Sequence, residues 1–255
     1  MSREAEQREE AVTVKQTLIE RMDARLYPGV SNNWDDSLFR QRILDAMAPA
    51  MTVLDIGAGA GLVAQMNFRG KCAHIAGIDL DERVVDNDYL DEGKVGGAES
   101  LPWEDSRFDL VFSDNVLEHL ANPEAVFAEV ARVLKPGGRF LVKTPNKFHY
   151  VPLIASLTPH FFHRYYNSLR GRPSADTFPT LYRANTPRDV RRLAVSSGLE
   201  VKSVDLIESR PEYLRLSAPT YLLGWVWERL VNRIQMLSRF RVLLVAEFEK
   251  PAASI

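Results

Sequence analysis

The chain has 255 residues, of which 45% are hydrophobic, enough for one large α/β domain with a full core and somewhat short for two independent domains. Its 32 basic and 34 acidic residues leave a formal net charge of -2, so no overall attraction for a polyanion is expected and nucleic acid is a poor candidate partner. Cys72 is the only cysteine, which excludes a disulfide within the chain and a cysteine-rich metal site.

A cytoplasmic location is expected. The first ten residues carry charges of both signs and lack the apolar core of a secretory signal, and no uncharged apolar run approaches the ~20 residues that a membrane span needs. The lone cysteine suits a reducing compartment. The five histidines show no HExxH-type spacing, so no metal site is expected.

In chain order, the first expected element is a charged helix over residues 4–25 that ends at Pro28 and Gly29. A second helix, capped by Asp36 or Ser37, is expected to reach Met47. Short apolar runs then alternate with helical patterns, which predicts a parallel sheet with helices on both faces. Strands are expected at 52–56, 74–78, 108–113, 139–144, 199–207 and 241–248, and helices from Gly61, from Asp81, and at 123–134, 187–197 and 220–237.

The segment VLDIGAGAGL, residues 53–62, combines a strand with a glycine-rich turn. Gly57, Gly59 and Gly61 let the backbone turn tightly and approach a ligand closely where a helix begins. A dinucleotide fingerprint, G-x-G-x-x-G, would need a third glycine where this chain has Leu62. The turn therefore predicts a nucleotide-like ligand at the carboxyl edge of the sheet and disfavours NAD.

Asp79 closes the second expected strand, about 20 residues after the glycines. An acidic side chain at this place can accept hydrogen bonds from ribose hydroxyls. The glycine turn and the acid are each weak signals alone, and in this order they support one another.

Five segments resemble, in order and spacing, the class I S-adenosylmethionine-dependent methyltransferases, particularly the ubiquinone-biosynthesis-like type 11 branch: VLDIGAGAGL, GIDLD, GGAESLPW, FDLVFSDNVLEHL and VLKPGG. The resemblance covers roughly residues 52–144. It implies an α/β, Rossmann-like fold with a mostly parallel seven-stranded sheet, an antiparallel last strand and helices on both faces. It also implies S-adenosylmethionine as cofactor and S-adenosylhomocysteine as product.

On this resemblance the chain is expected to be a single methyltransferase domain, residues 1–255. Residues 1–48 would form a helical lid or arm, and 49–144 the cofactor-binding core. An irregular stretch, 145–186, would be an acceptor-binding insertion, because an irregular segment this long in a compact domain is usually functional. Residues 187–255 would complete the sheet and add an apolar helix.

Position by position, the resemblance places Gly57, Ala58 and Gly59 against the homocysteine part of the cofactor. It places Asp55 near the methionine amine and Asp79 on the ribose. These five residues are expected to hold the ends of the cofactor that lie nearest the turn.

The resemblance places Leu80, Ala98 and Glu99 beside the adenine, and Asn115 at the methionine end. Many relatives have an aspartate before the Ala-Glu pair to bond the adenine amino group, whereas this chain has Gly97. Backbone groups or Glu99 would therefore have to make that bond.

His119 is a candidate general base, because methyl transfer to a hydroxyl or amine needs a group with a pKa near neutrality. The alternative is that His119 caps or packs under a helix, with Glu118 as a solvated first-turn acid favoured by the helix dipole. The sequence leaves both interpretations open.

The insertion supplies further candidates. His149, Tyr150, His163 and Tyr166 could line an acceptor pocket beyond the end of the preceding strand. Aromatic residues of this kind also pack on sheets without any direct role, and that alternative is favoured for each one. Tyr27 and Trp34 could likewise fold over the cofactor as a lid or simply pack at the surface.

The helix expected at 220–237 has apolar residues at helical spacing, so contact with the core or with a second copy is the default expectation. The stripe consists of Leu222, Leu223, Val226, Trp227, Leu230, Ile234 and Leu237. Four arginines lie nearby, at positions 229, 233, 239 and 241, so peripheral contact with a membrane or a lipid-linked acceptor is the alternative.

The predicted function is methyl transfer from S-adenosylmethionine to a small-molecule, natural-product or glycan- or lipid-linked acceptor at oxygen or nitrogen, with a homodimer possible. A noncatalytic S-adenosylmethionine-binding partner subunit is the alternative. Leu62 disfavours an NAD-dependent oxidoreductase. A nucleic-acid methyltransferase is disfavoured because SDNV stands where a motif such as N/D-P-P-Y would serve base amines.

Overall fold

The computed structural model describes residues 18–157 and 179–252, which fall into two compact units. One unit comprises Asp35–Ile207 and the residues from Val242 onward. The other comprises the residues up to Trp34 together with Glu208–Arg241, so its two parts are far apart in the sequence. The prediction of a single domain in four segments stays a prediction.

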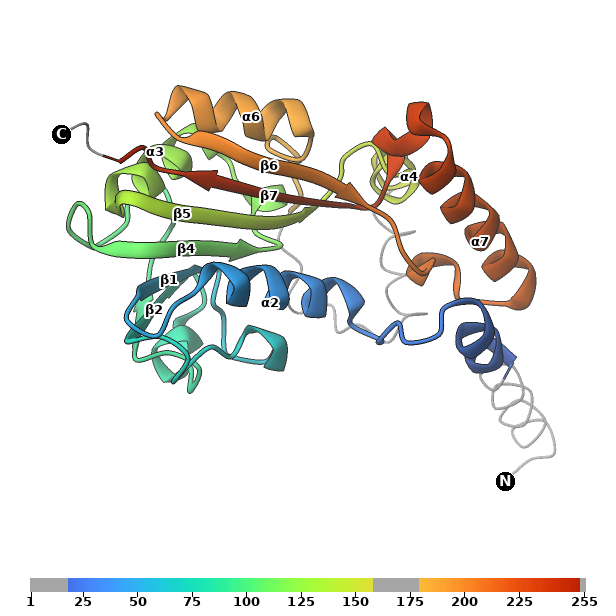
Figure 1. Ribbon diagram of the computed structural model, residues 1–255, viewed down its shortest axis with the longest axis horizontal. Helices are drawn as coiled ribbons and strands as arrows, with labels where there is room; N and C mark the ends of the chain where they lie inside the picture. The colour runs from blue at the N-terminus through green and yellow to red at the C-terminus, as the bar shows by residue number, and fades with distance from the viewer. Residues whose placement is uncertain (1–17, 158–178, 253–255) are drawn as a thin grey trace. The chain divides into compact units, whose positions relative to one another are not determined.

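The unit beginning at Asp35 contains a seven-stranded sheet (Figure 1). The strands lie in the order β3-β2-β1-β4-β5-β7-β6; β1 to β5 pair in parallel, and β7 is antiparallel to both neighbours. Their bounds are β1 Thr52–Ile56, β2 His74–Asp79, β3 Glu92–Val95, β4 Phe108–Asp114, β5 Leu134–Pro145, β6 Glu200–Ile207 and β7 Leu243–Glu249. The predicted fold class, including the antiparallel last strand, is confirmed.

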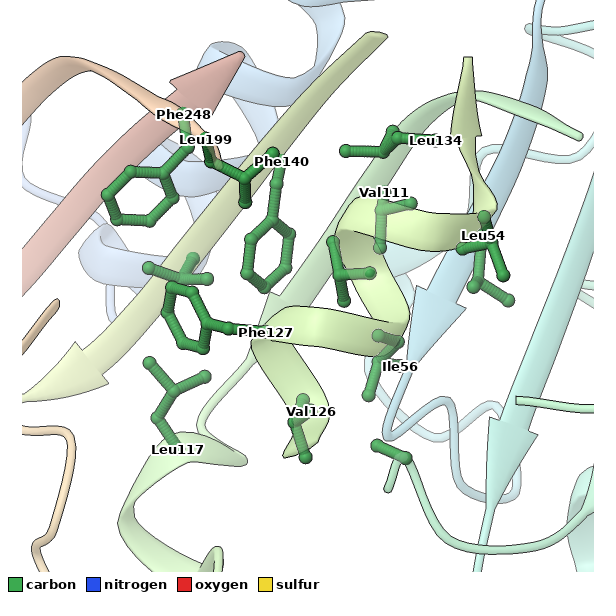
Figure 2. Close-up of a cluster of buried hydrophobic side chains, with 14 of the residues drawn as sticks. Leu54, Ile56, Val111, Leu117, Val126, Phe127, Leu134, Phe140, Leu199 and Phe248 are labelled. Carbon is green, nitrogen blue, oxygen red and sulfur yellow. The ribbon is translucent and has the colours of Figure 1, made fainter. Parts of the chain in front are cut away.

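Two helices cover one face of the sheet. They are α3, Pro123–Val133, and α6, Pro187–Ser196, and their apolar side chains form one cluster with alternate residues of the strands. Phe127 of α3 makes edge-to-face contacts with Phe140 of β5 and Phe248 of β7, at centroid distances of 5.4 and 5.7 Å (Figure 2). Aromatic pairs of this geometry stabilise a core beyond the area that they bury.

Both helices begin where the sequence carries a cap followed by proline. Asn122 accepts a hydrogen bond from the Ala125 N–H, and Thr186 accepts one from the Asp189 N–H. Each side chain satisfies an N–H group that has no partner within the helix, and proline at the next position needs no such partner. The starts of these helices agree with the sequence-based prediction.

The opposite face is covered by α2, Trp34–Ala46, whose Phe39 and Ile43 are fully buried. On this side Phe68 makes an edge-to-face contact with Phe112 of β4, and the Arg40 guanidinium lies 4.8 Å from the Phe68 ring centroid. The helix begins earlier than the predicted cap at Asp36 or Ser37. Its early start places acidic residues in the first turn, where the helix dipole favours them.

The helices predicted from Gly61 and from Asp81 are wrong. Short 3-10 turns stand in their place, η1 at Ala64–Met66 and η2 at Glu82–Asp86. Arg40 donates hydrogen bonds to the carbonyls of Gln65 and Asn67, at 2.5 and 2.8 Å, which occupies acceptors that a longer helix would use. The strand β3 was missed because its sequence, EGKV, is polar and contains glycine.

The second unit contains the helical residues 18–26, a 3-10 turn η5, Glu212–Leu214, the helix α7, Ala218–Arg233, and the 3-10 segment η6, Gln235–Phe240. Asp23 accepts hydrogen bonds from the Tyr221 hydroxyl at 2.7 Å and from the Arg215 guanidinium at 2.5 Å. Within the described residues, no helix is long and apolar enough to cross a membrane.

Contact of the predicted apolar stripe with the core is wrong for most of its residues, and its contact with a second copy or a membrane stays a prediction. The buried residues of α7 are Tyr221, Gly224, Glu228 and Val231, whereas most of the predicted stripe is exposed. The helix is held by Tyr221 bonded to Asp23 and by Gly224, where an added Cβ would lie 2.5 Å from Pro211. Hydrogen bonds and the close approach of Gly224 to Pro211 therefore determine which face of α7 is buried. The apolar periodicity of the sequence does not reveal these interactions.

Candidate functional site

Three strands of the sheet end together. In the parallel register, Ile56 of β1 lies beside Ile78 of β2 and Ser113 of β4. The residues that follow, Gly57, Asp79 and Asp114, are therefore brought to the same carboxyl edge. In an open parallel sheet, ligands bind at this edge, where neighbouring connections diverge.

The backbone of the glycine turn has a conformation that residues with side chains rarely adopt. Gly57, Gly59 and Gly61 have φ values of 85°, 50° and 70°, a region that residues with a Cβ rarely adopt. A Cβ on Gly57 would lie 2.2 Å from Val116 Cγ2, and one on Gly61 would lie 2.3 Å from Asn87 Oδ1. The turn therefore needs glycine both for its conformation and for its close neighbours.

Two side chains hold this turn from the adjacent connection. Asn87 donates hydrogen bonds to the carbonyls of Ala58 and Gly59, at 3.0 and 3.1 Å. Asp79 Oδ2 accepts a hydrogen bond of 2.8 Å from the Gly59 N–H, and its Oδ1 accepts one from the Asp81 N–H. Asn87 is buried, so its bonds are shielded from water and fix the loop.

A cavity of about 250 Å³ lies against the turn. Its lining comprises Asp55, Gly57, Ala58, Gly59, Ala60, Gly61, Leu62, Val63, Met66, Asp79, Asp81, Arg83, Asn87, Tyr89 and Asp114. A larger hollow of about 340 Å³ involves Thr52, the first residue of β1, and so lies at the opposite end of that strand. The cavity at the turn is the candidate site because it contains the residues that the topology gathers.

The cavity is lined by several carboxyl groups. Burial, followed by the charges of Asp114 and Asp79, raises the pKa of the Asp55 carboxyl well above its usual value. Burial also raises the pKa of Asp114 to about 6; Lys143 opposes this rise, and Asp36 and Asp35 add to it. A cation bound here would favour the ionised form of both carboxyls.

Lys143 forms ion pairs with Asp114 and with two carboxylates at the start of α2. It is fully buried, and its Nζ lies 2.9 Å from Asp114 Oδ1 and 3.3 Å from Asp35 Oδ2, with Asp36 as a third partner. Burial lowers the pKa of Lys143, but the three carboxylates outweigh burial and raise it. One buried cation therefore ties the start of α2 to the ends of β4 and β5.

The predicted cofactor residues divide into two groups. Asp55, Gly57, Ala58, Gly59 and Asp79 line the cavity together. Four others do not line it: Leu80 is exposed, Ala98 lies in the core beside the sheet, Glu99 is exposed, and Asn115 follows Asp114 with a φ of 54°. The contacts predicted for these four stay predictions.

Glu99 lies where the missing aspartate side chain would begin. A Cβ built on Gly97 would be 2.9 Å from Glu99 Oε2 and 3.9 Å from Leu80 Cδ2. The carboxylate of Glu99 thus occupies the space beside Gly97, and its use at the adenine edge stays a prediction.

His119 lies in η3, Leu117–His119, with its side chain 31% exposed. Its Nδ1 lies 3.0 Å from the Pro179 carbonyl, which can only accept, so Nδ1 donates in this pair. In a neutral ring the lone pair is then on Nε2, which lies 4.0 Å from Glu118 Oε1. The geometry is compatible with both interpretations of His119, and the base role stays a prediction.

Glu118 belongs to a buried polar chain. It accepts a hydrogen bond of 2.9 Å from the Thr144 hydroxyl, which in turn accepts one of 2.6 Å from the Asn185 side chain. Burial raises the pKa of Glu118. The predicted solvated first-turn acid is therefore wrong for Glu118, which bridges η3, β5 and the end of the insertion.

Two of the remaining candidates, His149 and Tyr150, do not line the cavity. His149 is buried against Tyr150, with ring centroids 4.0 Å apart, and burial lowers its pKa to about 3. His163 and Tyr166 lie outside the described residues. The acceptor contacts of all four stay predictions.

The predicted lid residues belong to the other compact unit. The Tyr27 hydroxyl donates a hydrogen bond of 3.0 Å to Glu228, and its ring meets Tyr221 edge to face. These bonds give Tyr27 a structural role within that unit. Contact of Tyr27 and Trp34 with the cofactor stays a prediction.

Sequence reasoning missed Asn87 and Lys143 as members of the candidate site. The resemblance placed Asp114 in the turn at the methionine end but singled out Asn115, whereas the residue of this turn that lines the cavity is Asp114. Lys143 is a charged residue within the apolar run of β5, which is a signal for a buried pair. Asn87 carried no signal, because its role depends on how residues 80–90 fold back on the turn.

Part of the chain is similar in sequence to known methyltransferases. Residues 54–142 match the family model of the type 11 methyltransferase domain. The ubiquinone biosynthesis O-methyltransferase of Thiobacillus denitrificans is 29% identical over 202 residues, which are 71% of this chain and 80% of that protein. Residues 54–142 are therefore a class I methyltransferase domain of the type 11 branch, as the resemblance implied.

Two further similarities are a partial sequence match to another methyltransferase and a structural match that concerns the fold. The Maricaulis maris ubiquinone biosynthesis O-methyltransferase is 36% identical over 110 residues, 38% of this chain and 41% of that protein. The Haemonchus contortus phosphoethanolamine N-methyltransferase 2, solved with phosphomonomethylethanolamine and S-adenosylhomocysteine, shares 17% identity, a TM-score of 0.52, 90% of this chain and 56% of that one. The chain thus spans less than half the length of several curated relatives.

S-adenosylmethionine is the cofactor of this family, as predicted, and the cavity suits it. A sulfonium and an ammonium carry positive charge, and the cavity presents buried carboxyls whose pKa values are raised. The three glycines of the turn line the cavity and carry no side chain that would keep a ligand from the backbone.

Proposed function

We propose that this methyltransferase transfers the methyl group of S-adenosylmethionine to an oxygen or nitrogen atom of a small-molecule acceptor. The observation that carries the proposal is the acidic cavity at the glycine turn, within the residues that match the family model. The sulfonium supplies an activated methyl group. The protein's part is to position both partners, to exclude water and to handle a proton where the acceptor releases one.

At the methionine end, Gly57, Ala58 and Gly59 would face the homocysteine part, with Asn115 beside it. Asp55 and Asp114 would face the positive charges of the cofactor. Their raised pKa values mean that charge on these carboxyls is costly in the free protein, and a bound cation offsets that cost.

At the nucleoside end, Asp79 would accept hydrogen bonds from the ribose hydroxyls. Each of its oxygens already accepts one backbone N–H, and a carboxylate oxygen has a further lone pair available. Leu80 and Ala98 would lie along the adenine, and Glu99, which fills the space beside Gly97, would take the adenine edge.

On the acceptor side, His119 is proposed to take the proton of an acceptor hydroxyl at Nε2. The Pro179 carbonyl orients the ring by accepting from Nδ1, which leaves Nε2 as the basic nitrogen. His149, Tyr150, His163 and Tyr166 are proposed to shape the acceptor pocket. The pKa of His149, lowered to about 3 by burial, makes it a neutral hydrogen-bonding group there.

The test is transfer of labelled methyl from S-adenosylmethionine to a panel of phenol, catechol, alcohol and amine acceptors, with formation of S-adenosylhomocysteine measured in parallel. The proposal expects turnover on at least one acceptor and a strong decrease in Asp79→Asn. Asp88→Asn is the matched control, because Asp88 is exposed and lies outside the cavity lining.

His119→Gln separates the two acceptor classes. If the residue is the base, turnover on a hydroxyl acceptor should fall by roughly 10²- to 10⁴-fold while cofactor affinity is retained. Full turnover across neutral pH would leave His119 structural. Tight cofactor binding with no transfer to any acceptor would instead support the noncatalytic partner subunit.

A further inference from the structure

The outer face of α7 is apolar and exposed. Leu223, Val226 and Leu230 are 67%, 46% and 42% exposed, and at 100° per residue they fall on one side of the helix. Leu222 and Ile234 extend the same side, and Met236 of η6 is also exposed. The buried residues of the helix lie on its opposite face, whereas the side chains of this stripe keep 41–67% of their surface exposed.

The stripe carries a positive border. At 100° per residue, Arg229 and Arg233 project from the same exposed side of the helix as Leu222 and Val226. Residues 218–241 contain four arginines and a single acid, Glu228. That acid is buried, where it accepts hydrogen bonds from Tyr27 and Asn232 and pairs with Arg229. The exposed face is therefore apolar and basic.

Another helix of the chain shows that this composition is specific to α7. The exposed positions of α6 include Arg188 and Arg191, but Val195 is its one large exposed apolar residue in the described structure. A helix with arginines alone is an ordinary solvated surface. Contiguous exposed apolar side chains with a basic border are typical of helices that lie in a membrane interface.

We propose that the exposed face of α7 and η6 binds the surface of a lipid membrane with anionic headgroups. The helix would lie in the plane of the surface, with its leucines among the acyl chains and its arginines at the headgroups. Charge favours this occupant over a second copy of the chain. In a symmetric pair formed through this face, Arg229 and Arg233 of both copies would bring positive charge to the interface, and the one acid of residues 218–241, the buried Glu228, offsets only Arg229.

The experiment is co-sedimentation of the full chain with phosphatidylcholine vesicles that contain or lack phosphatidylglycerol. Binding to the anionic vesicles is expected, together with weakening by added salt and much weaker binding to phosphatidylcholine alone. The measurement needs neither cofactor nor acceptor, so its result is independent of the proposed enzymatic activity.

Two variants test the two parts of the face, each with a control on α6. Leu223→Glu with Leu230→Glu should abolish binding, and Val195→Glu should not. Arg229→Gln with Arg233→Gln should weaken binding to anionic vesicles by roughly tenfold or more, and Arg188→Gln with Arg191→Gln should leave it unchanged. Thermal melting checks that each variant is folded. If Arg229 proves necessary for folding, Arg233→Gln alone tests the contribution of charge to vesicle binding.

Three results would overturn the proposal. The first is no binding of the unaltered chain to anionic vesicles. The second is equal loss of binding in the α6 controls, which would indicate general charge attraction. The third is a concentration-dependent dimer that Leu223→Glu dissociates, which would make a second copy the occupant of this face.

Discussion

Asp114 gives the cofactor site a pH dependence that can be calculated from the structure. Its pKa is raised to about 6 by burial, against the opposing effect of Lys143 and with the help of Asp36 and Asp35. A cationic ligand beside it should bind the ionised form. If binding requires that form, affinity falls by the fraction protonated, which makes it roughly tenfold weaker at pH 5 than at pH 8.

The same raised pKa makes folding stability change with pH in the opposite direction to cofactor affinity. The folded state binds a proton on Asp114 more tightly than the unfolded state, so its contribution to stability is present at low pH and is lost as pH rises through about 6. A bound sulfonium should offset this loss. Thermal melting with and without S-adenosylmethionine should therefore show a stabilisation by ligand that grows between pH 5 and pH 8.

Calorimetric titration with S-adenosylmethionine from pH 5 to pH 8 is the assay. Asp114→Asn should lower affinity at pH 8 and reduce the slope, with the remaining slope due to Asp55, whose pKa is also raised. S-adenosylhomocysteine lacks the sulfonium charge and should show a shallower dependence. Equal affinity for S-adenosylmethionine at pH 5 and pH 8, or an unchanged slope in Asp114→Asn, would refute the reasoning.

Three further substitutions have defined outcomes. Gly57→Ala places a Cβ 2.2 Å from Val116 Cγ2 at a φ of 85°, so cofactor binding measured by calorimetry should be lost; retained binding would contradict the tight-turn account. Asn87→Ala removes the hydrogen bonds to the Ala58 and Gly59 carbonyls and should weaken cofactor binding roughly tenfold. An unchanged Kd would show that these bonds are not needed to hold the turn for binding. Phe127→Ala should lower the free energy of unfolding by about 3–5 kcal/mol in urea titrations, since the fully buried ring packs on two others; a loss under 1 kcal/mol would show that the core relaxes.

Much of the sheet could be predicted from the sequence, because buried parallel strands are short apolar runs with distinct boundaries. The antiparallel β7 followed from the family resemblance and is confirmed by its register with β5 and β6. The helices after β1 and β2 could not be predicted correctly. After β1 a distant side chain, Arg40, takes the carbonyls of Gln65 and Asn67, which local sequence does not reveal.

The candidate site was predictable where position along a strand decides the role. Asp79 and the three glycines follow strand ends, and the structure gathers them around one cavity. The buried pairing of Asp114 with Lys143 spans two strands and the start of α2, which local pattern does not reveal. The sequence left open whether the apolar stripe of α7 meets the core or another partner, and long-range bonds such as Tyr221 to Asp23, which local pattern does not reveal, hold the opposite face of the helix inward.

The central claim is that the glycine turn, with its acidic surroundings, binds a methyl donor and not a dinucleotide. Calorimetry of the purified chain with S-adenosylmethionine, S-adenosylhomocysteine and NAD tests it most directly, with Asp79→Asn beside Asp88→Asn. The account predicts saturable binding of the first two ligands, no binding of NAD, and a roughly tenfold or greater loss of affinity in Asp79→Asn alone. Preference for NAD, or unchanged affinity in Asp79→Asn, would contradict it.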